Sequence, residues 1–378
     1  MTQQPLHTRA EKLSSARKST PWTRYEEADL GFRNYWYPAM LSRQLRSKPA
    51  AVQILGEKLV FVRSQGKCYA LRDRCPHRGV PLSLGTCEFP GTNTITCRYH
   101  GWTFDLSNGL CVAAITDGPD SSIVGKVRVS TYPVEEKKGF IWVFIGDRQP
   151  VPPLEEDVPE DILEDRAVLG VRVTLRDGNW KLAAENGLDP SHAAFLHRHA
   201  WLTVFRRFPA YKTNVVPQIG NRSVGYTQGP SVLEDEYPGL GRWPQNEHRQ
   251  WWKNMRKRPT VSALHLPGYL RVDPFPTPGI VHIEWYVPFD ERHHRYFQIA
   301  VKRTTGLKAW RFRLAYWLLW RWLAHVDFNG QDAQLVQLMD PFYAEEAGWD
   351  RERLFRPDIV LTAWRKYCHE NARATQSE

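Results

Sequence analysis

Two short segments decide the fold of the N-terminal part of the chain: Cys75-Pro76-His77-Arg78-Gly79 and Cys97-Arg98-Tyr99-His100-Gly101-Trp102. Each segment pairs one cysteine with one histidine, as C-x-H and as C-x-x-H, and the 19 residues 78–96 separate the pairs. Two loops can therefore present two thiolates and two imidazoles to one metal centre. Zinc is the structural alternative, although zinc fingers and ribbons usually begin with two closely spaced cysteines and pair like ligands.

One cysteine and one histidine from each loop is the pattern of a Rieske [2Fe-2S] cluster, in which two cysteines bind one iron and two histidines the other. The sequence therefore predicts a cluster held by Cys75, His77, Cys97 and His100. Cys87 lies between the two loops and is a bystander, because the ligand set is complete without it. Six cysteines in 378 residues also argue against a disulfide framework.

A second candidate metal site lies in residues 180–197, where His192 and His197 follow Asp189-Pro190-Ser191. Two histidines alone are weak evidence, but electrons from a Rieske cluster need an acceptor, and two histidines with one carboxylate form the usual non-heme Fe(II) site. Residues i and i+5 lie about 140° apart on an α-helix, so we expect a π-bulge or a break between them. His199 is the rival, but seven helical residues rise about 10.5 Å, which favours His197.

The carboxylate of this site should come from a distant part of the chain. Asp327 and Asp332 are both candidates, because both follow the aromatic run Lys308–His325. Asp327 can instead cap a helix, and Asp332 can be a solvated helix charge. Residue pattern alone leaves the two open.

The pattern of turn residues and short apolar runs changes along the chain. Residues 37–146 alternate β-like runs with turns, which predicts a small all-β domain, and the proline-rich stretch 149–153 indicates a linker. Beyond it, helical spacing in Trp180–Asn186 and Lys308–His325 mixes with the strand-like Gly279–Val287. We therefore expect an α+β fold.

Three regions follow from these patterns. They are an N-terminal segment 1–36 packing on the catalytic domain, a Rieske domain 37–150, and a catalytic α+β domain 151–378 with an antiparallel sheet and helices.

The charge balance and hydropathy restrict the possible partners. Fifty-one Lys and Arg against 41 Asp and Glu give a net charge of +10, which favours an acidic partner or a nucleic acid, and the charge alone does not choose between them. The basic, aromatic stretch Arg249–Arg258 is read as a solvated face, so no nucleic acid is expected. The longest apolar run, Leu314–Trp320, is too short to span a membrane, and residues 1–20 carry no apolar signal segment. A cytoplasmic protein without membrane contact is expected.

Short motifs in the same order along the chain carry a resemblance to a known family. They are Gly31-Phe32-Arg33-Asn34, Trp36-Tyr37-Pro38, Asp73-Arg74-Cys75, Glu185-Asn186-Gly187, Asp189-Pro190-Ser191-His192 and Phe328-Asn329 with Asp332. Through these motifs the chain resembles the terminal oxygenase component of Rieske non-heme iron ring-hydroxylating oxygenases, over nearly its whole length. Within that family it is most similar to the carbazole-oxidising branch.

The resemblance implies a role for each site residue. It assigns Cys75, His77, Cys97 and His100 to the cluster and His192, His197 and Asp332 to a mononuclear Fe(II). Asp189 becomes a bridge between a cluster histidine of one subunit and an iron-ligand histidine of its neighbour. Asn329 lines the iron pocket, and the carbonyl of Gly187 accepts a hydrogen bond from a ring N–H of the substrate. The alternatives are a capping role for Asp189 or Asn329 and a purely conformational role for Gly187.

The resemblance also implies the reaction and the partners. The chain is expected to form a homotrimer that takes electrons from a ferredoxin and an NAD(P)H-dependent ferredoxin reductase. It would use O₂ and these electrons to dihydroxylate an aromatic or N-heterocyclic compound such as carbazole. A Rieske monooxygenase or an N- or O-demethylase is the alternative. A mere electron carrier or a zinc protein would not need the roughly 230 residues beyond Val151.

Two details refine this expectation. Arginines 72, 74, 78 and 98 surround the cluster loops and either dock an acidic ferredoxin or are ordinary solvated side chains. The carbazole enzymes space their iron-binding histidines as H-x₃-H, whereas four residues separate His192 from His197, as in naphthalene-type dioxygenases. The pocket shape, and with it the substrate, depends on that difference.

Overall fold

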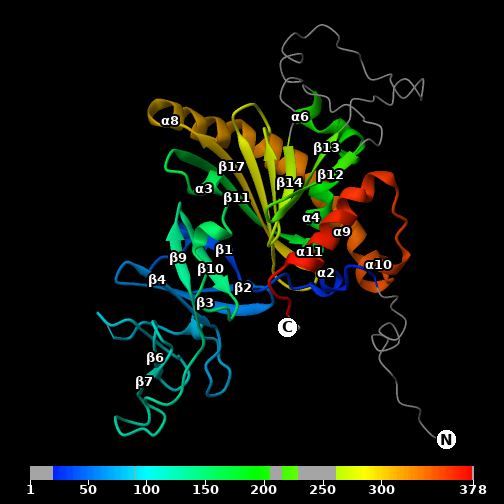
Figure 1. Ribbon diagram of the computed structural model, residues 1–378. Helices are drawn as coiled ribbons and strands as arrows, with labels where there is room; N and C mark the ends of the chain where they lie inside the picture. Colours follow the sequence, from blue (N-terminus) through cyan, green and yellow to red (C-terminus); the bar gives the residue numbers. More distant parts are fainter. Residues whose placement is uncertain (1–19, 90, 205–214, 229–260, 377–378) are drawn as a thin grey trace, which may run out of the picture. The chain divides into compact units, whose positions relative to one another are not determined.

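A computed structural model describes residues 20–89, 91–204, 215–228 and 261–376, so the stretch Arg249–Arg258 and the first 19 residues lie outside the described part. The chain forms two compact units (Figure 1). The N-terminal unit comprises Leu30–Ala167, Val287–Glu291 and Arg373–Glu378. The C-terminal unit comprises Met1–Asp29, Val168–Tyr286 and Arg292–Ala372.

The N-terminal unit continues beyond residue 150 because the segment after the prolines packs back on its first strand. The indole Nε1 of Trp36 donates to the carbonyl of Pro152 at 2.8 Å, and its backbone N donates to Asp157 Oδ2 at 2.9 Å. The two units thus divide the chain near residues 30 and 168, whereas the sequence patterns place the boundaries at 36 and 150. The three regions expected from the sequence, with boundaries at residues 36 and 150, stay a prediction.

The N-terminal unit consists of three small antiparallel sheets. One sheet has the order β1-β10-β9, the second β2-β3-β4-β8 and the third β5-β6-β7. The strands are β1 Tyr35–Leu41, β2 Ala50–Ile54, β3 Glu57–Ser64, β4 Lys67–Arg72, β5 Thr94–Thr96, β6 Trp102–Asp105, β7 Cys111–Ala114, β8 Thr131–Tyr132, β9 Val134–Lys137 and β10 Phe140–Ile145. Short helices are η1 Ser42–Gln44, η2 Leu82–Leu84, η3 Leu154–Glu156 and α3 Glu160–Leu163.

The C-terminal unit is built on a seven-stranded sheet with the order β11-β17-β16-β15-β14-β13-β12. Strands β12 to β16 pair antiparallel. The strands are β11 Ala167–Asp177, β12 Val215–Gly220, β13 Ser223–Gln228, β14 Val261–His265, β15 Tyr269–Asp273, β16 Val281–Pro288 and β17 His293–Arg303. With its helices, this unit confirms the predicted α+β fold.

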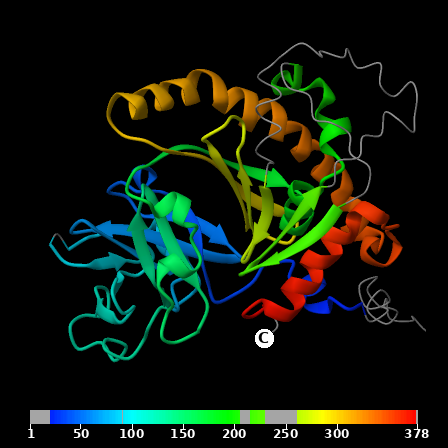
Figure 2. The ribbon, with the colours of Figure 1, turned by 45° about the horizontal axis from the view of Figure 1, so that its top comes forward.

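A long helical run extends along this sheet (Figure 2). It comprises α8 Gly306–Ala315, the π-helix η6 Tyr316–Phe328 and α9 Asn329–Glu345, so the predicted helix is confirmed but its second half is π-helical. Helix α4, Trp180–Leu188, contacts α9 as well as strands β14 and β15. The remaining helices are α2 Thr23–Glu27, α5 Ala193–Leu196, η4 His197–His199, α6 Trp201–Val204, α10 Gly348–Arg351, η7 Arg356–Asp358 and α11 Ile359–Asn371.

The first described helix packs inside the C-terminal unit. Arg24 of α2 donates from Nη1 to the carbonyl of His369 in α11 at 2.8 Å. Lys181 of α4 is fully buried and donates to Asp29 Oδ1 at 2.7 Å. Among the described residues, no helix combines the length and hydropathy needed to cross a bilayer.

Candidate metal centres

The two cysteine loops of the N-terminal unit adopt the same turn. Cys75 follows strand β4 and Cys97 follows β5. The carbonyl of Cys75 accepts from the Gly79 N–H at 2.9 Å, and that of Cys97 accepts from the Gly101 N–H at 3.0 Å. Both glycines have positive φ, 78° and 69°, which a residue with a side chain rarely adopts. The spacing C-x₃-G in both loops therefore builds two matching turns.

These turns bury the two thiols and leave the two imidazoles nearer the surface. Cys75 and Cys97 are 2% and 3% exposed and belong to the apolar core of the unit. His77 is exposed and His100 half-buried, and their Nδ1 atoms lie 3.0 Å apart. The Trp102 ring stacks on His77 with a centroid distance of 4.6 Å. Two buried thiols and two neighbouring imidazoles supply the ligand types of a Rieske cluster, in which two cysteines bind one iron and two histidines the other.

The protonation of the thiols fits a metal as their partner. Burial raises the pKa of Cys75 to about 12, a backbone hydrogen bond at His77 opposes that rise, and the neighbouring Cys97 thiol adds to it. The buried Cys75 thiol thus resists ionisation on its own. A bound metal cation removes that resistance, because it deprotonates the thiols that coordinate it. The residues present therefore fit a [2Fe-2S] cluster.

In the C-terminal unit, helix α4 ends before the segment that carries the two histidines. Pro190 has no N–H and cannot continue α4, which ends at Leu188. His192 then precedes the four-residue helix α5, and a 3₁₀ turn begins at His197. The predicted break between the two histidines is therefore present as the change from α5 to the 3₁₀ turn at His197 rather than beside Pro190, and the centroids of the two imidazole rings lie 5.2 Å apart.

The break lets both histidines face one carboxylate on α9. His192 Nε2 lies 3.5 Å and His197 Nε2 lies 3.2 Å from Asp332 Oδ1. Among the described residues, these three form the one group of His, Cys, Asp or Glu side chains whose ligand atoms all lie within 4.8 Å of one another. Two ligand atoms about 2.1 Å from a metal and at right angles lie roughly 3 Å apart, so the spacing fits one metal ion.

The neighbours of this group orient its donor atoms. Gln331 Oε1 can only accept, so His197 Nδ1, 3.2 Å away, carries the proton and leaves the Nε2 lone pair facing Asp332. Asn186 of α4 donates from Nδ2 to Asp332 Oδ1 at 3.0 Å. Sequence reasoning assigned no role to Asn186 or Gln331, although each lies beside a predicted site residue. Such outer partners commonly fix the orientation of metal ligands.

Asp189 uses its two carboxylate oxygens differently. Oδ1 accepts from the backbone N and the hydroxyl of Ser191 at 2.8 and 2.6 Å, which is a local turn. Oδ2 faces His192 Nδ1 at 3.5 Å. Burial raises the pKa of Asp189, but the hydrogen bond and charge of His192 outweigh burial, so this pKa lies below its usual value. Asp189 can therefore both close the Ser191 turn through Oδ1 and orient His192 through Oδ2.

The rival ligands take other positions. Asp327 accepts through Oδ2 from the backbone N of Trp201 at 2.7 Å, so it caps the start of α6. His199 is exposed and lies outside the three-residue group.

Asp332 itself keeps a low pKa in its pocket. Burial raises the pKa of Asp332, whereas His197 and His192, with a hydrogen bond from Asn186, bring it below its usual value. The carboxylate is thus ionised at neutral pH, which is the state a metal ligand requires.

The carbonyl of Gly187 has neither of its usual helical donors. Pro190, three residues later, has no N–H, and the N–H of Ser191, four residues later, donates to Asp189 Oδ1. A Cβ at Gly187 would collide with the Tyr286 hydroxyl and would lie 2.9 Å from Leu270 Cδ2. Close packing therefore demands glycine at this position.

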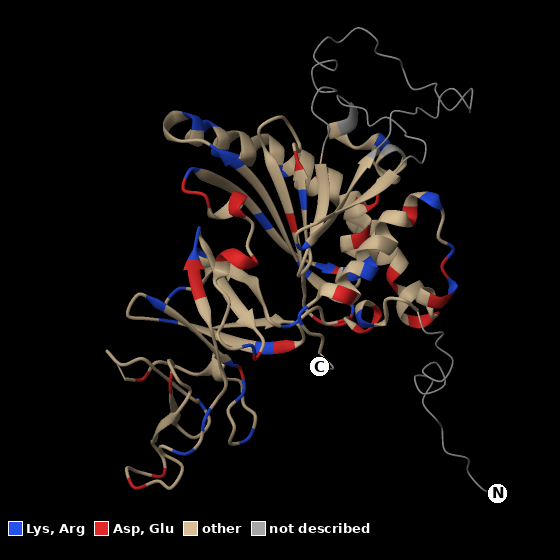
Figure 3. Cartoon of the chain, viewed as in Figure 1, with Lys and Arg blue, Asp and Glu red and all other residues tan. Residues whose placement is uncertain are grey.

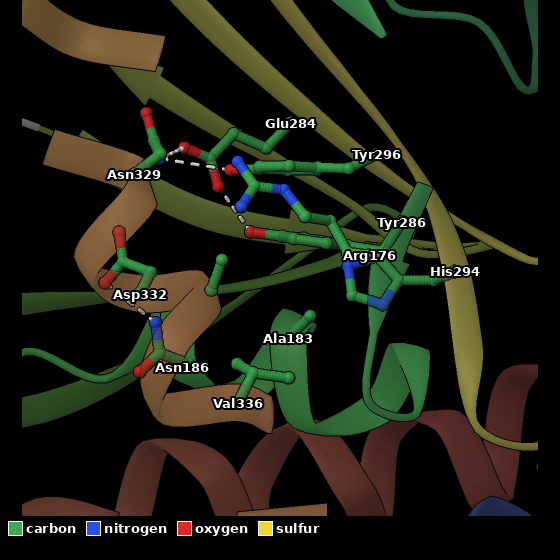
Figure 4. A pocket seen from close by; sticks show the side chains of 11 residues that line it. Arg176, Ala183, Asn186, Glu284, Tyr286, His294, Tyr296, Asn329, Asp332 and Val336 are labelled. Atoms are coloured by element: carbon green, nitrogen blue, oxygen red, sulfur yellow. Dashed lines mark hydrogen bonds between the residues drawn. The ribbon is translucent and has the colours of Figure 1, made fainter. Parts of the chain in front are cut away.

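Asn329 and Asp332 both line a small cavity (Figure 4). The cavity measures about 20 Å³, which is room for a water molecule. Its lining residues come from α4, α9 and three strands: Arg176, Ala183, Asn186, Glu284, Tyr286, His294, Tyr296, Asn329, Asp332, Ala333 and Val336. Figure 4 shows Asn329 bonded to Glu284 and Tyr296 on the sheet side of Asp332.

Comparisons with known families agree with both sites. The Rieske [2Fe-2S] domain family matches residues 35–133, and the family described as homotrimeric ring hydroxylase matches residues 144–376. The terminal oxygenase component of carbazole 1,9a-dioxygenase from Sphingomonas sp is 37% identical over 370 residues, covering 95% of this chain and 97% of that protein.

Solved structures show the same similarity. The terminal oxygenase of carbazole 1,9a-dioxygenase from Nocardioides aromaticivorans IC177 superposes with a TM-score of 0.82 at 33% identity, covering 94% of this chain and 98% of the other. A chain of the reduced complex between oxygenase and ferredoxin in carbazole 1,9a-dioxygenase gives a TM-score of 0.83 at 31% identity. The superposition covers 98% of this chain and 97% of the other.

The cofactors that accompany this pair of domains are a Rieske [2Fe-2S] cluster and a mononuclear non-heme iron. The two cysteine loops lie in the part of the chain that matches the Rieske family, and the His-His-Asp group lies in the part that matches the ring-hydroxylase family. The chain therefore belongs to the Rieske non-heme iron ring-hydroxylating oxygenases, as the terminal oxygenase component of an aromatic-ring dioxygenase.

Proposed function

We propose that this oxygenase dihydroxylates an N–H heterocycle such as carbazole, with His192, His197 and Asp332 binding the mononuclear iron. The cluster ligands in this proposal are Cys75, His77, Cys97 and His100. The convergence of two imidazoles and one carboxylate within 4.8 Å carries the iron assignment. When bound, the iron would activate O₂ and the cluster would deliver electrons to it.

The chain's own side chains would prepare the iron site for that chemistry. Asn186 and Gln331 hold Asp332 and His197 in the orientations that present Oδ1 and Nε2 to one point. Asp189 faces the outer nitrogen of His192 and keeps its negative charge there. A carboxylate in this position orients the imidazole and raises its basicity as a ligand.

Asp189 would also be the link to the cluster that serves this iron. In a homotrimer, the cluster of one subunit would face Asp189 of the next, so that a hydrogen bond from a cluster histidine completes the path. The homotrimeric description of the matching family supports this assembly. The geometry of Asp189 supports it as well, because Oδ1 alone satisfies the Ser191 turn, and Oδ2, which faces His192, has a second lone pair for a further donor.

The carbonyl of Gly187 would select the substrate edge that approaches the iron. It lacks its helical donors, so a ring N–H can supply the missing hydrogen bond. The relatives named for carbazole oxidation support this substrate class. A carbonyl left without a partner costs roughly 1 to 3 kcal/mol, which sets the preference for an N–H heterocycle over a hydrocarbon of the same shape.

Electrons would reach the cluster from a ferredoxin, reduced in turn by an NAD(P)H-dependent ferredoxin reductase in the cytoplasm. The solved oxygenase–ferredoxin complexes of similar chains support this partner. Arg72, Arg74, Arg78 and Arg98 are all exposed around the cluster loops, and Figure 3 colours the basic positions blue. A basic surface of this kind attracts an acidic protein and weakens that attraction as salt is added.

Two measurements test the proposal. Iron and acid-labile sulfide analysis with visible absorption should find the cluster and one further iron per chain, whereas a colourless zinc protein would refute it. Turnover of carbazole, fluorene and dibenzofuran should give dihydroxylated products with carbazole preferred. Equal affinity and identical regiochemistry for all three compounds would refute the hydrogen bond to the Gly187 carbonyl. Products that carry one oxygen atom from all three compounds would favour a monooxygenase.

A further inference from the structure

A buried charge lies in the central part of the sheet, outside the proposed ligand set. Glu284 is 5% exposed in the middle of β16, a strand that is otherwise almost entirely buried. His282, Glu284 and Tyr286 share one face of this strand, because side chains alternate, while Ile283 and Trp285 share the other. An ionised carboxylate at such a position is costly unless its hydrogen bonds are complete.

The bonds of Glu284 are complete, and they determine the orientation of Asn329. Oε1 accepts from Asn329 Nδ2 at 2.6 Å and lies 2.8 Å from His282 Nε2, while Oε2 accepts from the Tyr286 hydroxyl at 2.5 Å. A carboxylate only accepts, so the amide nitrogen of Asn329 must face Glu284. The same nitrogen lies 3.0 Å from the Tyr296 hydroxyl.

Asn329 lies at the point where the helical geometry changes. The π-helix η6 ends at Phe328, and Asn329 is the first residue of α9 and 3% exposed. Asp332 follows three residues later, so both side chains leave the same face of the first turn. Figure 4 shows Asp332 on that turn between the Asn329–Glu284 bond and Asn186. The rotation of this turn sets where Asp332 points.

We propose that Glu284 is a positioning residue of the mononuclear iron site, acting through Asn329. The hydrogen bond between them locks the first turn of α9 against β16, and Asn186 on α4 holds the carboxylate from the other side. Asp332 Oδ1 is thereby fixed beside His192 and His197 before any metal binds. The inference rests on the iron assignment proposed above.

A purely structural role for this network predicts a different result. Buried polar groups can be replaced by well-packed apolar ones with little loss of stability, and then the metal site would be unaffected. A positioning role instead links a change at Glu284 to iron affinity and to the spectrum of the iron site. The cluster of the N-terminal unit serves as an internal standard in the same molecule.

The first test is Glu284→Gln in the full-length protein. Iron should be removed with a chelator and returned by Fe²⁺ titration, with cluster absorption and thermal unfolding recorded on each sample. Loss of an outer partner commonly lowers metal affinity roughly 10- to 100-fold, which is the expected change. The EPR signal of the ferrous site with nitric oxide should shift, and the cluster spectrum should not.

Asp340→Asn is the matched control, because Asp340 is also a buried carboxylate on α9. It accepts from the Asn179 N–H at 2.9 Å and from Arg292 Nε at 2.8 Å, away from the His-His-Asp group. This variant should lower the unfolding temperature without changing iron affinity. Wild-type iron affinity and an unchanged signal in Glu284→Gln would overturn the proposal.

A polarity swap separates the hydrogen bond from the charge. Asn329→Ala removes the donor without changing net charge and should lower iron affinity as Glu284→Gln does. Asn329→Asp combined with Glu284→Gln restores both the net charge and a hydrogen bond of reversed direction, so affinity should recover above either single variant. No recovery, or a normal affinity in Asn329→Ala, would overturn the role of this bond.

The outcome also separates this inference from the assignment of the iron ligands. A wild-type protein that takes up no iron beyond its cluster refutes the proposed function itself. A wild-type protein that binds the iron, with Glu284→Gln and Asn329→Ala indistinguishable from it, refutes only the positioning role.

Discussion

The two candidate metal centres are held in different ways. The cluster ligands lie between residues 75 and 100, on two loops whose turns are closed by local backbone hydrogen bonds to Gly79 and Gly101. The iron group draws on residues between 192 and 332 and on two separate helical segments. Changes far from the iron should therefore disturb it, whereas the cluster should respond only to changes in its own loops.

The largest effect should come from removing a ligand of the His-His-Asp group, whose histidines and carboxylate are far apart in the sequence. Asp332→Ala deletes the carboxylate that both histidines face, at 3.5 and 3.2 Å. The loss of iron affinity should exceed the roughly 10- to 100-fold typical of an outer partner, and turnover should vanish. Metal analysis with cluster absorption checks this result. Asp327→Ala, which removes only the α6 cap, should keep the iron, and an iron-free Asp327→Ala protein would contradict the assignment.

The next effect concerns the connection between the two centres. Asp189→Asn should keep both metals, since Asp189 binds neither, but slow electron transfer from cluster to iron by roughly 10- to 100-fold. Single-turnover kinetics with a reduced cluster measure that rate. Ser191→Ala is the control, because it removes one bond to Oδ1 and leaves Oδ2 facing His192. Near wild-type product formation in Asp189→Asn would refute the bridge.

Close packing at Gly187 can be tested through the stability of the C-terminal unit. Gly187→Ala should destabilise the C-terminal unit by about 1 to 3 kcal/mol, because the added methyl overlaps the Tyr286 hydroxyl and crowds Leu270. Thermal unfolding measures the loss. Gly330→Ala meets no atom within 4 Å and lies in helix α9, so it should stabilise by about 1 kcal/mol. Equal stability of the two variants would contradict the close packing at Gly187.

The smallest effect is expected at the surface of the cluster loops. Arg78→Glu should raise the ferredoxin KM and flatten its salt dependence, since an exposed charge acts mainly on association. Dithionite reduction of the cluster should not change. Lys308→Glu in α8 of the C-terminal unit is the matched exposed control. If turnover of the wild-type protein with ferredoxin did not depend on salt concentration, the proposed docking surface would be refuted.

Local patterns predicted a large share of the molecule. The helix from Trp180, the strand within Gly279–Val287 and the helical run from Lys308 are all present, because their apolar spacing matches the periods of helix and strand. The interruption of the helix between His192 and His197 followed from helix geometry, although it lies at His197 and not beside Pro190. The π-helical form of Tyr316–Phe328 was not predicted, because composition and spacing do not distinguish π turns from α turns.

The sequence by itself predicted the four candidate cluster ligands and the two candidate iron histidines, because each set lies within one short segment with a recognisable spacing. The resemblance to the family had already selected Asp332, whereas the residue pattern left Asp327 open, and the tertiary structure shows that Asp332 faces both histidines. Only the tertiary structure showed that Asn186 contacts Asp332, Gln331 contacts His197 and Glu284 contacts Asn329. The physical reason is distance along the chain. Spacing rules describe contacts within a turn or a loop, whereas the packing of α9 between α4 and β16 depends on the whole core of the unit.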